Sequence, residues 1–256
     1  MEWSGSVAVI TGASRGIGAA VARAAAGRGA RLGLIARSEG ELSAVLDTCG
    51  GSGTCVVADV ADRAQITDAI DAIERELGSV DVLVNNAGIG AYGRFDEADL
   101  ELLERMMRVN YLGTVYATKA VLPGMLARGR GHIVNLASIA GRVGAPLEAG
   151  YSASKFAVVG LSEALGFELH GKGIGVSLVD PGPVRTDFFD ARGAPYTRPR
   201  PKPVAAESVA ELVMRAVSQG KAEQFIPRWL RVAWMIRVLM PGAYRRGTLR
   251  EFKGEL

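Results

Sequence analysis

Short apolar runs alternate with helical stretches along most of this chain, and this alternation restricts its fold more than any other feature. Seven runs are predicted to be strands, at residues 6–10, 31–36, 54–58, 81–84, 132–136, 176–179 and 223–226. Helical patterns lie between them, at residues 18–27, 38 onward, 63–77, 97–121, 152–170 and 206–219. Strands that are apolar on both faces and separated by helices indicate a parallel sheet covered on both sides. Right-handed crossovers then predict an α/β fold with a doubly wound, mostly parallel seven-stranded sheet.

The chain has 256 residues and is 48% hydrophobic, so it can bury the core of a single domain spanning 1–256. One stretch breaks the alternation: residues 185–205 contain four prolines and follow a predicted strand. Because α/β folds place ligand loops after strands, we expect this stretch to be a substrate lid rather than a domain linker.

The sequence carries no sign of export or of a metal site. No apolar run reaches the roughly 18 residues of a membrane span, and the first residues lack the basic start and apolar centre of a signal peptide. Cys49, Cys55, His132 and His170 are scattered, without the spacing of a zinc site. We therefore expect a cytoplasmic protein with two reduced packing cysteines and no metal.

A glycine-rich turn, Thr11-Gly-Ala-Ser-Arg-Gly-Ile-Gly18, follows the first predicted strand. Glycine permits a tight turn and lets backbone N–H groups approach a pyrophosphate, and the next helix points its positive N-terminus at the same place. Strand, turn and helix together predict a Rossmann-type dinucleotide site. The turn residues expected to bind the cofactor are Gly12, Ser14, Arg15, Gly16, Ile17 and Gly18.

The end of the second predicted strand favours NADP(H) over NAD. A NAD site places an acidic residue there to hold the ribose 2′-hydroxyl, but this chain has Ala36-Arg37-Ser38. Arg15 lies in the glycine turn as well, and two guanidinium groups suit a 2′-phosphate through charge-assisted bonds. We therefore expect Arg15, Arg37 and Ser38 to bind the phosphate of NADP.

Tyr151 and Lys155 are four residues apart on a predicted helix and so share a face. A tyrosine has a pKa of about 10, and a nearby ammonium group favours the phenolate. Tyr151 is then a general acid for ketone reduction and a general base for alcohol oxidation. Ser138, just past the strand at 132–136, is placed where its hydroxyl can orient a carbonyl.

Further polar motifs follow other predicted strands: Asn85-Asn86-Ala87-Gly88 and Asp180-Pro181-Gly182. Asn110-Tyr111-Leu112-Gly113 falls inside the helix predicted at 97–121, where asparagine and glycine are unfavourable unless a local kink has a purpose. With these motifs, with Asp59-Val60 and with Tyr151-Ser-Ala-Ser-Lys155, residues 5–190 resemble the short-chain dehydrogenase/reductase family.

The resemblance implies a role for each matching residue. Asn110, Ser138, Tyr151 and Lys155 would form the catalytic tetrad: Ser138 would hold the substrate oxygen, Lys155 would also bind the nicotinamide ribose, and Asn110 would hold a water. Asp59 and Val60 would contact adenine, and Asn86, Ala87 and Gly88 the adjoining ribose. The nicotinamide carboxamide would be held by Pro181, Gly182, Val184 and Thr186. Family members are commonly homodimers or homotetramers joined through the long helices, here 97–121 and 152–170.

The C-terminal extension, residues 227–256, is basic and apolar. Residues 192–256 hold 13 of the 30 Lys and Arg but only five of the 27 Asp and Glu. Residues 227–240 are apolar around most of a helical wheel, so this helix must be buried against something. Three partners remain open: the substrate cleft, another subunit, or a membrane surface contacted through 227–246. We expect a small-molecule carbonyl or alcohol substrate of lipophilic character.

Other functions remain as alternatives. A 3-oxoacyl-carrier-protein reductase shares the core motifs, and the basic tail could meet an acidic carrier. Gly12-Ala-Ser14-Arg-Gly16 also fits the nucleophile elbow of a serine hydrolase, although neither histidine lies late in the chain. A non-catalytic NADP-binding regulator would keep the fold but would not need Tyr151. The basic residues do not form a recognition helix, so we expect no nucleic-acid partner.

Overall fold

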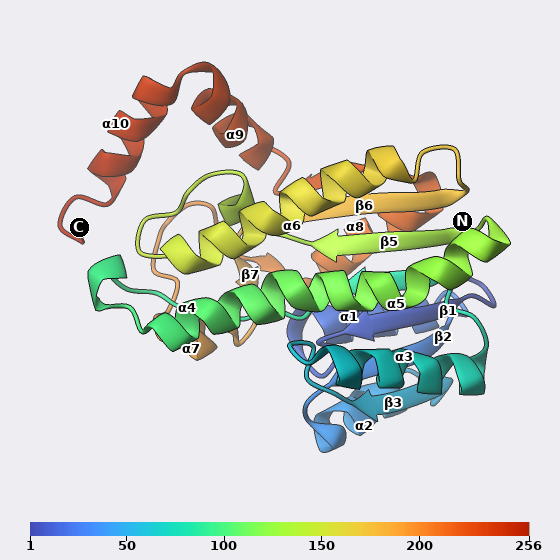
Figure 1. Ribbon diagram of the computed structural model, residues 1–256. Helices are drawn as coiled ribbons and strands as arrows, with labels where there is room; N and C mark the ends of the chain where they lie inside the picture. Colours follow the sequence, from blue (N-terminus) through green and yellow to red (C-terminus); the bar gives the residue numbers. More distant parts are fainter. Residues whose placement is uncertain (256) are drawn as a thin grey trace.

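The computed structural model describes residues 1–255 and contains one seven-stranded parallel sheet with helices on both faces (Figure 1). The strand order is β3-β2-β1-β4-β5-β6-β9, and every pairing is parallel. The predicted doubly wound sheet is therefore confirmed. The strands are β1 Val7–Thr11, β2 Arg31–Ala36, β3 Gly53–Val57, β4 Val82–Asn85, β5 Gly131–Leu136, β6 Ile174–Pro181 and β9 Glu223–Ile226.

Alternate residues of the interior strand β1 pack into two separate cores, as a sheet covered on both faces requires. Ala8 and Ile10 of β1 pack with helices α1, α2 and α8, whereas Val7 and Val9 pack with α3 and α5 on the other face. All five residues of β1 are buried. The helices of the two layers are α1 Gly16–Ala26, α2 Glu39–Thr48, α3 Arg63–Leu77, α4 Leu100–Met106, α5 Gly113–Arg128, α6 Ala149–Glu168 and α8 Ala206–Gln219.

The strand order reverses between β1 and β4, because the chain runs outward through β2 and β3 and then returns beside β1. A crevice forms at the carboxyl ends of the strands where such a reversal occurs, and ligands of doubly wound sheets bind there. The fold therefore places the loops after β1, β4, β5 and β6 around one site.

The prediction of a single regular helix at 97–121 is wrong, because the helix is interrupted by a π-helical segment. α4 is followed by a π-helical segment, η2 Met107–Leu112, and then by α5, which runs through Pro123 to Arg128. The widened turn contains Asn110, and π-helical turns often occur at functional sites. The short 3-10 segments are η1 Phe95–Glu97 and η3 Ile139–Gly141.

Residues after β6 build the region above the carboxyl edge. The predicted loop 185–205 contains three short elements, β7 Val184–Arg185, α7 Phe188–Ala191 and β8 Val204–Ala205. The helix predicted within 227–240 is confirmed as α9 Leu230–Leu239, and a second helix, α10 Pro241–Glu251, follows it to form a hairpin. Figure 1 shows this hairpin standing outside the two helical layers of the sheet.

Cys49 and Cys55 are free thiols that pack against the core, and burial raises the pKa of both. Within residues 1–255, no cluster of three metal-ligating side chains occurs. No helix in the same range combines the length and apolar character needed to cross a membrane.

Candidate active site

The glycine turn between β1 and α1 has a shape that side chains at key positions would destroy. Gly12 and Gly16 have φ of +64° and +56°, in the left-handed region that favours glycine. A Cβ at Gly18 would lie 2.2 Å from the Gly12 carbonyl oxygen, so α1 can pack on the turn only with glycine there. Gly18 is buried and does not line the cleft, whereas the other predicted turn residues do.

Asn86 holds the glycine turn against the end of β4. Its side-chain amide donates to the carbonyl oxygens of Thr11 and Gly12, both at 3.0 Å. The hydroxyl of Thr11 accepts hydrogen bonds from the backbone N–H groups of Asn86 and Ala87, at 3.1 and 3.2 Å. The amide of Asn86 is therefore already engaged in shaping the turn, a role that its sequence motif did not indicate.

The end of the cleft beside the carboxyl ends of β2 and β3 is strongly polar. Arg15 and Arg37 are exposed and line the cleft, and no ion pair within residues 1–255 engages either guanidinium group. Ser38 is the N-cap of α2, but its hydroxyl makes no capping bond. Glu41, which the sequence motifs did not indicate, lines the same end. A cationic pair and an uncommitted hydroxyl at a helix N-terminus fit a phosphate group.

Asp59 and Val60 also line this end. The Asp59 carboxylate accepts from the backbone of Ala61 at 2.9 Å and pairs with Arg105 at 3.2 Å. Both contacts fix the turn after β3. The remaining residues predicted to bind the cofactor also line the cleft, and they lie at or near the ends of β4, β6 and β7. They are Asn86, Ala87, Gly88, Pro181, Gly182, Val184 and Thr186.

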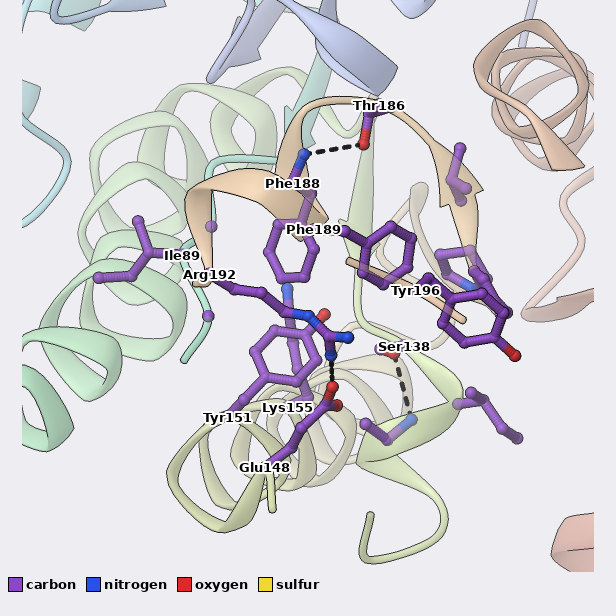
Figure 2. Close-up of a pocket in the computed structure, with 18 of the residues that line it drawn as sticks. Ile89, Ser138, Glu148, Tyr151, Lys155, Thr186, Phe188, Phe189, Arg192 and Tyr196 are labelled. Carbon is purple, nitrogen blue, oxygen red and sulfur yellow. Dashed lines mark hydrogen bonds and ion pairs between the residues drawn. The ribbon is translucent and has the colours of Figure 1, made fainter. Parts of the chain in front are cut away.

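Tyr151 and Lys155 project from α6 into the same cleft as Ser138, which follows β5 (Figure 2). The Lys155 ammonium lies 5.9 Å from the centroid of the Tyr151 ring and donates to the carbonyl oxygen of Leu136 at 2.8 Å. The Ser138 hydroxyl accepts from the backbone of Ala140 at 3.1 Å and also interacts with the Tyr151 phenol. The structure thus brings these three predicted side chains together.

The protonation of the Tyr–Lys pair is controlled mainly by burial. Burial raises the pKa of Tyr151 to about 12, and the hydrogen bond from Ser138 opposes this only in part. Burial lowers the pKa of Lys155 to about 8, against the effect of the Asp180 carboxylate. The sequence predicts a lowered tyrosine pKa; in this structure desolvation has the larger effect, because it disfavours the phenolate.

Asn110 holds the loop after β4 through the π-helical turn. Its side chain accepts from the backbone N–H of Ile89 at 2.8 Å and donates to the Ile89 carbonyl and to the Ser154 hydroxyl, at 2.9 and 2.8 Å. A Cβ on Gly88 would lie 3.3 Å from the Asn110 side-chain oxygen and 3.5 Å from the Lys155 nitrogen. Asn110 therefore lies behind the cleft lining, close to Lys155.

A buried ionic cluster supports the site from behind, and the sequence did not indicate it. Arg142 pairs with Asp180 at 3.0 Å and with Glu163 at 3.2 Å, and it also pairs with Glu223. Burial raises the pKa of Asp180 to about 7, against the opposing effects of Arg142 and Lys155. One Asp180 carboxylate oxygen has no hydrogen-bond partner within residues 1–255. The cluster adds a buried carboxylate to the electrostatic environment of Lys155.

The whole cleft has a volume of about 1170 Å³. Aromatic side chains surround the part of it beyond Tyr151. Phe188 lies 5.4 Å from Tyr151 and 5.9 Å from Phe189, whose ring is 5.2 Å from that of Tyr196. Arg192 pairs with Glu148, and its guanidinium lies 4.7 Å from the Phe189 ring centroid (Figure 2). Segment 185–205 therefore supplies an apolar wall beside the Tyr151 ring.

The C-terminal hairpin forms a further wall of the cleft and is tied to this segment. Arg198 pairs with Glu251 and Glu255, at 3.5 and 2.9 Å, and lies 3.6 Å from the centroid of the buried Phe252 ring. Glu255 also accepts from the Tyr92 hydroxyl at 2.6 Å. The cleft is one of the three places that the sequence left open for this tail.

The serine hydrolase alternative does not fit the structure. Ser14 lies at the carboxyl edge of the sheet, in the glycine turn. His132 is near the amino end of β5, buried and 2.8 Å from the Ser177 hydroxyl. His170 is exposed in the loop that leads from α6 to β6, at the amino edge. Neither imidazole is placed to activate Ser14.

A doubly wound sheet, a glycine cradle and a Tyr–Lys pair opening on one cleft define an oxidoreductase that uses a nicotinamide cofactor. The family model described as short chain dehydrogenase matches residues 6–196. The chain therefore belongs to the short-chain dehydrogenase/reductase family. α9 and α10 lie beyond the matched residues.

Among curated relatives, 2-(S)-hydroxypropyl-CoM dehydrogenase 3 of Xanthobacter autotrophicus is 44% identical over 181 residues, covering 70% of this chain and 71% of that protein. The 3-oxoacyl-(acyl-carrier-protein) reductase of Escherichia coli is 36% identical over 191 residues, covering 75% of this chain and 78% of that protein. A Burkholderia phymatum short chain dehydrogenase/reductase solved with NAD has a TM-score of 0.88 and 31% identity, covering 95% of this chain and 96% of its own. An alcohol dehydrogenase of Thermococcus sibiricus, complexed with 5-hydroxy-NADP, has a TM-score of 0.77 and 30% identity, covering 86% and 94%.

Proposed function

We propose that this protein is an NADP-dependent oxidoreductase that reduces a carbonyl to a secondary alcohol, or runs the reverse reaction, with Tyr151 as general acid or base. The observation that carries the proposal is the meeting of Ser138, Tyr151 and Lys155 in the cleft that also contains the glycine turn. The bound nicotinamide supplies the hydride for reduction and accepts it in oxidation.

The protein's own residues supply the proton and the orientation. In reduction the Ser138 hydroxyl donates a hydrogen bond to the carbonyl oxygen, and Tyr151 transfers its phenolic proton to that oxygen. A pKa of about 12 keeps Tyr151 protonated at neutral pH, which suits an acid in reduction. In oxidation the phenolate takes the alcohol proton, and the Lys155 ammonium stabilises that phenolate.

The preference for NADP rests on Arg15, Arg37 and Ser38. Both arginines lie at the cleft edge without an ion pair among the described residues, and Ser38 precedes the positive N-terminus of α2. Glu41 is exposed on the same rim and could instead favour a ribose hydroxyl. We assign NADP because two cations and a hydroxyl outweigh one exposed carboxylate for a dianionic phosphate.

The substrate is proposed to be lipophilic, with segment 185–205 acting as its lid. Phe188, Phe189, Tyr196, Trp229 and Leu230 line the part of the cleft beyond Tyr151. Burying a carbon-rich ligand against such a surface lowers the free energy of the complex, whereas a polar ligand finds few hydrogen-bond partners there.

A homodimer or homotetramer through α5 and α6 is part of the proposal. Leu126 on α5 and Phe167 on α6 are exposed, the latter by 83%. Large apolar side chains on helices of this kind are typical of subunit contacts.

Replacing Tyr151 with phenylalanine tests the reaction, because it removes the phenolic proton and little else. We expect NADPH affinity within about threefold of wild type and a fall in turnover of about 10²–10⁴-fold across ketones of increasing chain length. Unchanged turnover would refute Tyr151 as the acid, and it is also the result that a non-catalytic NADP-binding regulator predicts. A preference for short, polar ketones would refute the lipophilic substrate.

A carrier-bound 3-oxoacyl thioester is the second candidate, favoured by the similarity to the Escherichia coli reductase. Its acyl chain would also suit an aromatic cleft. Turnover of a free long-chain ketone and of the carrier-bound thioester, compared at equal concentration, separates the two.

A further inference from the structure

Helix α9 carries apolar side chains on two opposite faces, and the structure accounts for only one of them. Leu230, Ala233, Trp234 and Arg237 recur at helical spacing along the inner face. Leu230 and Ala233 line the cleft, the Trp234 ring stacks on Phe225 at 6.2 Å, and the Arg237 guanidinium lies 5.2 Å from the Phe156 ring centroid. This face attaches α9 to the protein.

The outer face is a continuous apolar stripe. Its residues follow the spacing i, i+3, i+4, i+7, i+8 and are between 40% and 72% exposed. The stripe consists of Val232, Met235, Ile236, Leu239 and Met240. Single exposed apolar residues are ordinary, but a stripe of five over two helical turns is typical of a surface that binds a partner.

The charged residues along the hairpin are arginines, except for Glu251 at its end, which pairs with Arg198. Residues 224–250 contain six arginines and no Asp or Glu. Arg237 is held against Phe156, and the other five are exposed: Arg228, Arg231, Arg245, Arg246 and Arg250. None of these five has an ion pair with any residue in 1–255. The surface therefore combines an apolar stripe with an unneutralised cationic border.

We propose that the α9–α10 hairpin docks this protein on the surface of a bilayer rich in anionic lipids, with the apolar stripe immersed among the acyl chains. A helix of this kind lies in the membrane interface, where apolar burial and attraction to anionic headgroups add together. Trp229, 51% exposed at the start of α9, has the side chain that prefers this depth.

A second copy of the chain fits the surface less well. In a two-fold interface the same patch meets itself, which would bring five arginines of one copy toward five of the other. Like charges across an interface oppose association, and the hairpin has no acidic residue between 224 and 250 to relieve them.

Docking would place the substrate cleft beside the lipid, since α9 carries the stripe on one face and, on the other, Leu230 and Ala233, which line the cleft. A lipophilic carbonyl could then enter from the bilayer. This consequence rests on the proposed function, whereas docking itself is measured without turnover.

Vesicle flotation of the full chain tests the proposal. We expect wild type to float with phosphatidylglycerol–phosphatidylcholine vesicles at low salt and to bind pure phosphatidylcholine at least about 10-fold less. Ile236→Asp with Leu239→Asp, and separately Arg245→Glu with Arg246→Glu, should each weaken binding by about 25-fold or more. Two matched controls should bind as wild type: Val57→Asp, which replaces a similarly exposed apolar residue on β3, and Arg31→Glu with Arg63→Glu, on distant surfaces.

Tryptophan fluorescence of the wild-type protein provides a second measurement, which does not depend on the charged variants. Brominated lipids should quench the emission of Trp229, and Trp229→Phe should remove most of the quenching. Absence of flotation and quenching, or equal binding to neutral vesicles, would overturn the proposal. So would a smaller sedimenting species for the Ile236→Asp, Leu239→Asp variant in the absence of lipid, because that result assigns the stripe to a second copy. Unchanged NADPH binding and turnover in the arginine variant would separate docking from catalysis.

Discussion

If Arg37 binds the 2′-phosphate as proposed, replacing it with aspartate should weaken NADPH binding selectively. Arg37 follows the last residue of β2, is exposed, lines the end of the cleft beside β2 and β3 and has no ion pair within residues 1–255. Its substitution therefore removes a phosphate ligand without breaking a contact that holds the fold.

The size of the effect has two parts. A hydrogen bond to a charged group is worth about 1.5–3 kcal/mol, and the lower figure applies because Arg37 is exposed. A new carboxylate about 5 Å from a dianionic phosphate adds about 1.7 kcal/mol of repulsion in water, which salt screening over about 8 Å reduces by roughly half. The total of about 2.4 kcal/mol corresponds to a roughly 60-fold loss of NADPH affinity.

NADH lacks the 2′-phosphate, so its affinity should change by less than about threefold. Titration of nicotinamide fluorescence with each cofactor measures both dissociation constants. Arg31→Asp is the matched control, because Arg31 is exposed at the opposite end of the same strand. Equal losses for NADPH and NADH, or a loss of NADPH affinity below about fivefold, would refute the assignment of Arg37 to the phosphate.

Gly18→Ala places a Cβ 2.2 Å from the Gly12 carbonyl oxygen, so it should weaken NADPH binding by at least about 10-fold. The control Gly40→Ala, which has open space around the new Cβ, should leave the affinity unchanged. Unaltered NADPH affinity in Gly18→Ala would contradict the close packing of the turn. Burial lowers the pKa of His132 to about 4, below its unfolded value of 6.5, so its contribution to stability is complete above pH 6.5 and is lost as the pH falls toward 4. At pH 5 this loss is about 2 kcal/mol. The buried Asp180, whose pKa is raised to about 7, changes stability in the opposite sense over the same range, so the test is a comparison of variants. In urea unfolding at pH 7.5 and 5, the change in unfolding free energy should be about 2 kcal/mol less favourable in wild type and in His170→Gln than in His132→Gln.

The sequence was sufficient for the sheet and for much of the cleft because both depend on local rules. Gly12 and Gly16 mark a turn that only glycine can form, and the spacing of Tyr151 and Lys155 places them on one helical face. Since the carboxyl ends of parallel strands share one edge, Ser138 could be placed beside them without coordinates.

The features that sequence reasoning missed depend on contacts between distant segments. Arg142 meets Asp180, Glu163 and Glu223 from three separate elements, and no spacing in the chain indicates that cluster. The raised pKa of Tyr151 has the same origin, because it reflects how much protein covers the phenol. The kink around Asn110 was indicated by an unfavourable residue in a helix, but its π-helical form was not.

The ion pairs of Arg198 with Glu251 and Glu255 join segment 185–205 to the C-terminal hairpin, away from Ser138 and Tyr151. Under the proposed function, substrate selection therefore depends on residues that do not take part in the reaction. Ser138 and Tyr151 are anchored on β5 and α6, whereas the opposite wall is fastened at its rim by surface charges. Substitutions along that rim can therefore change the substrate specificity without changing the groups that carry out the reaction.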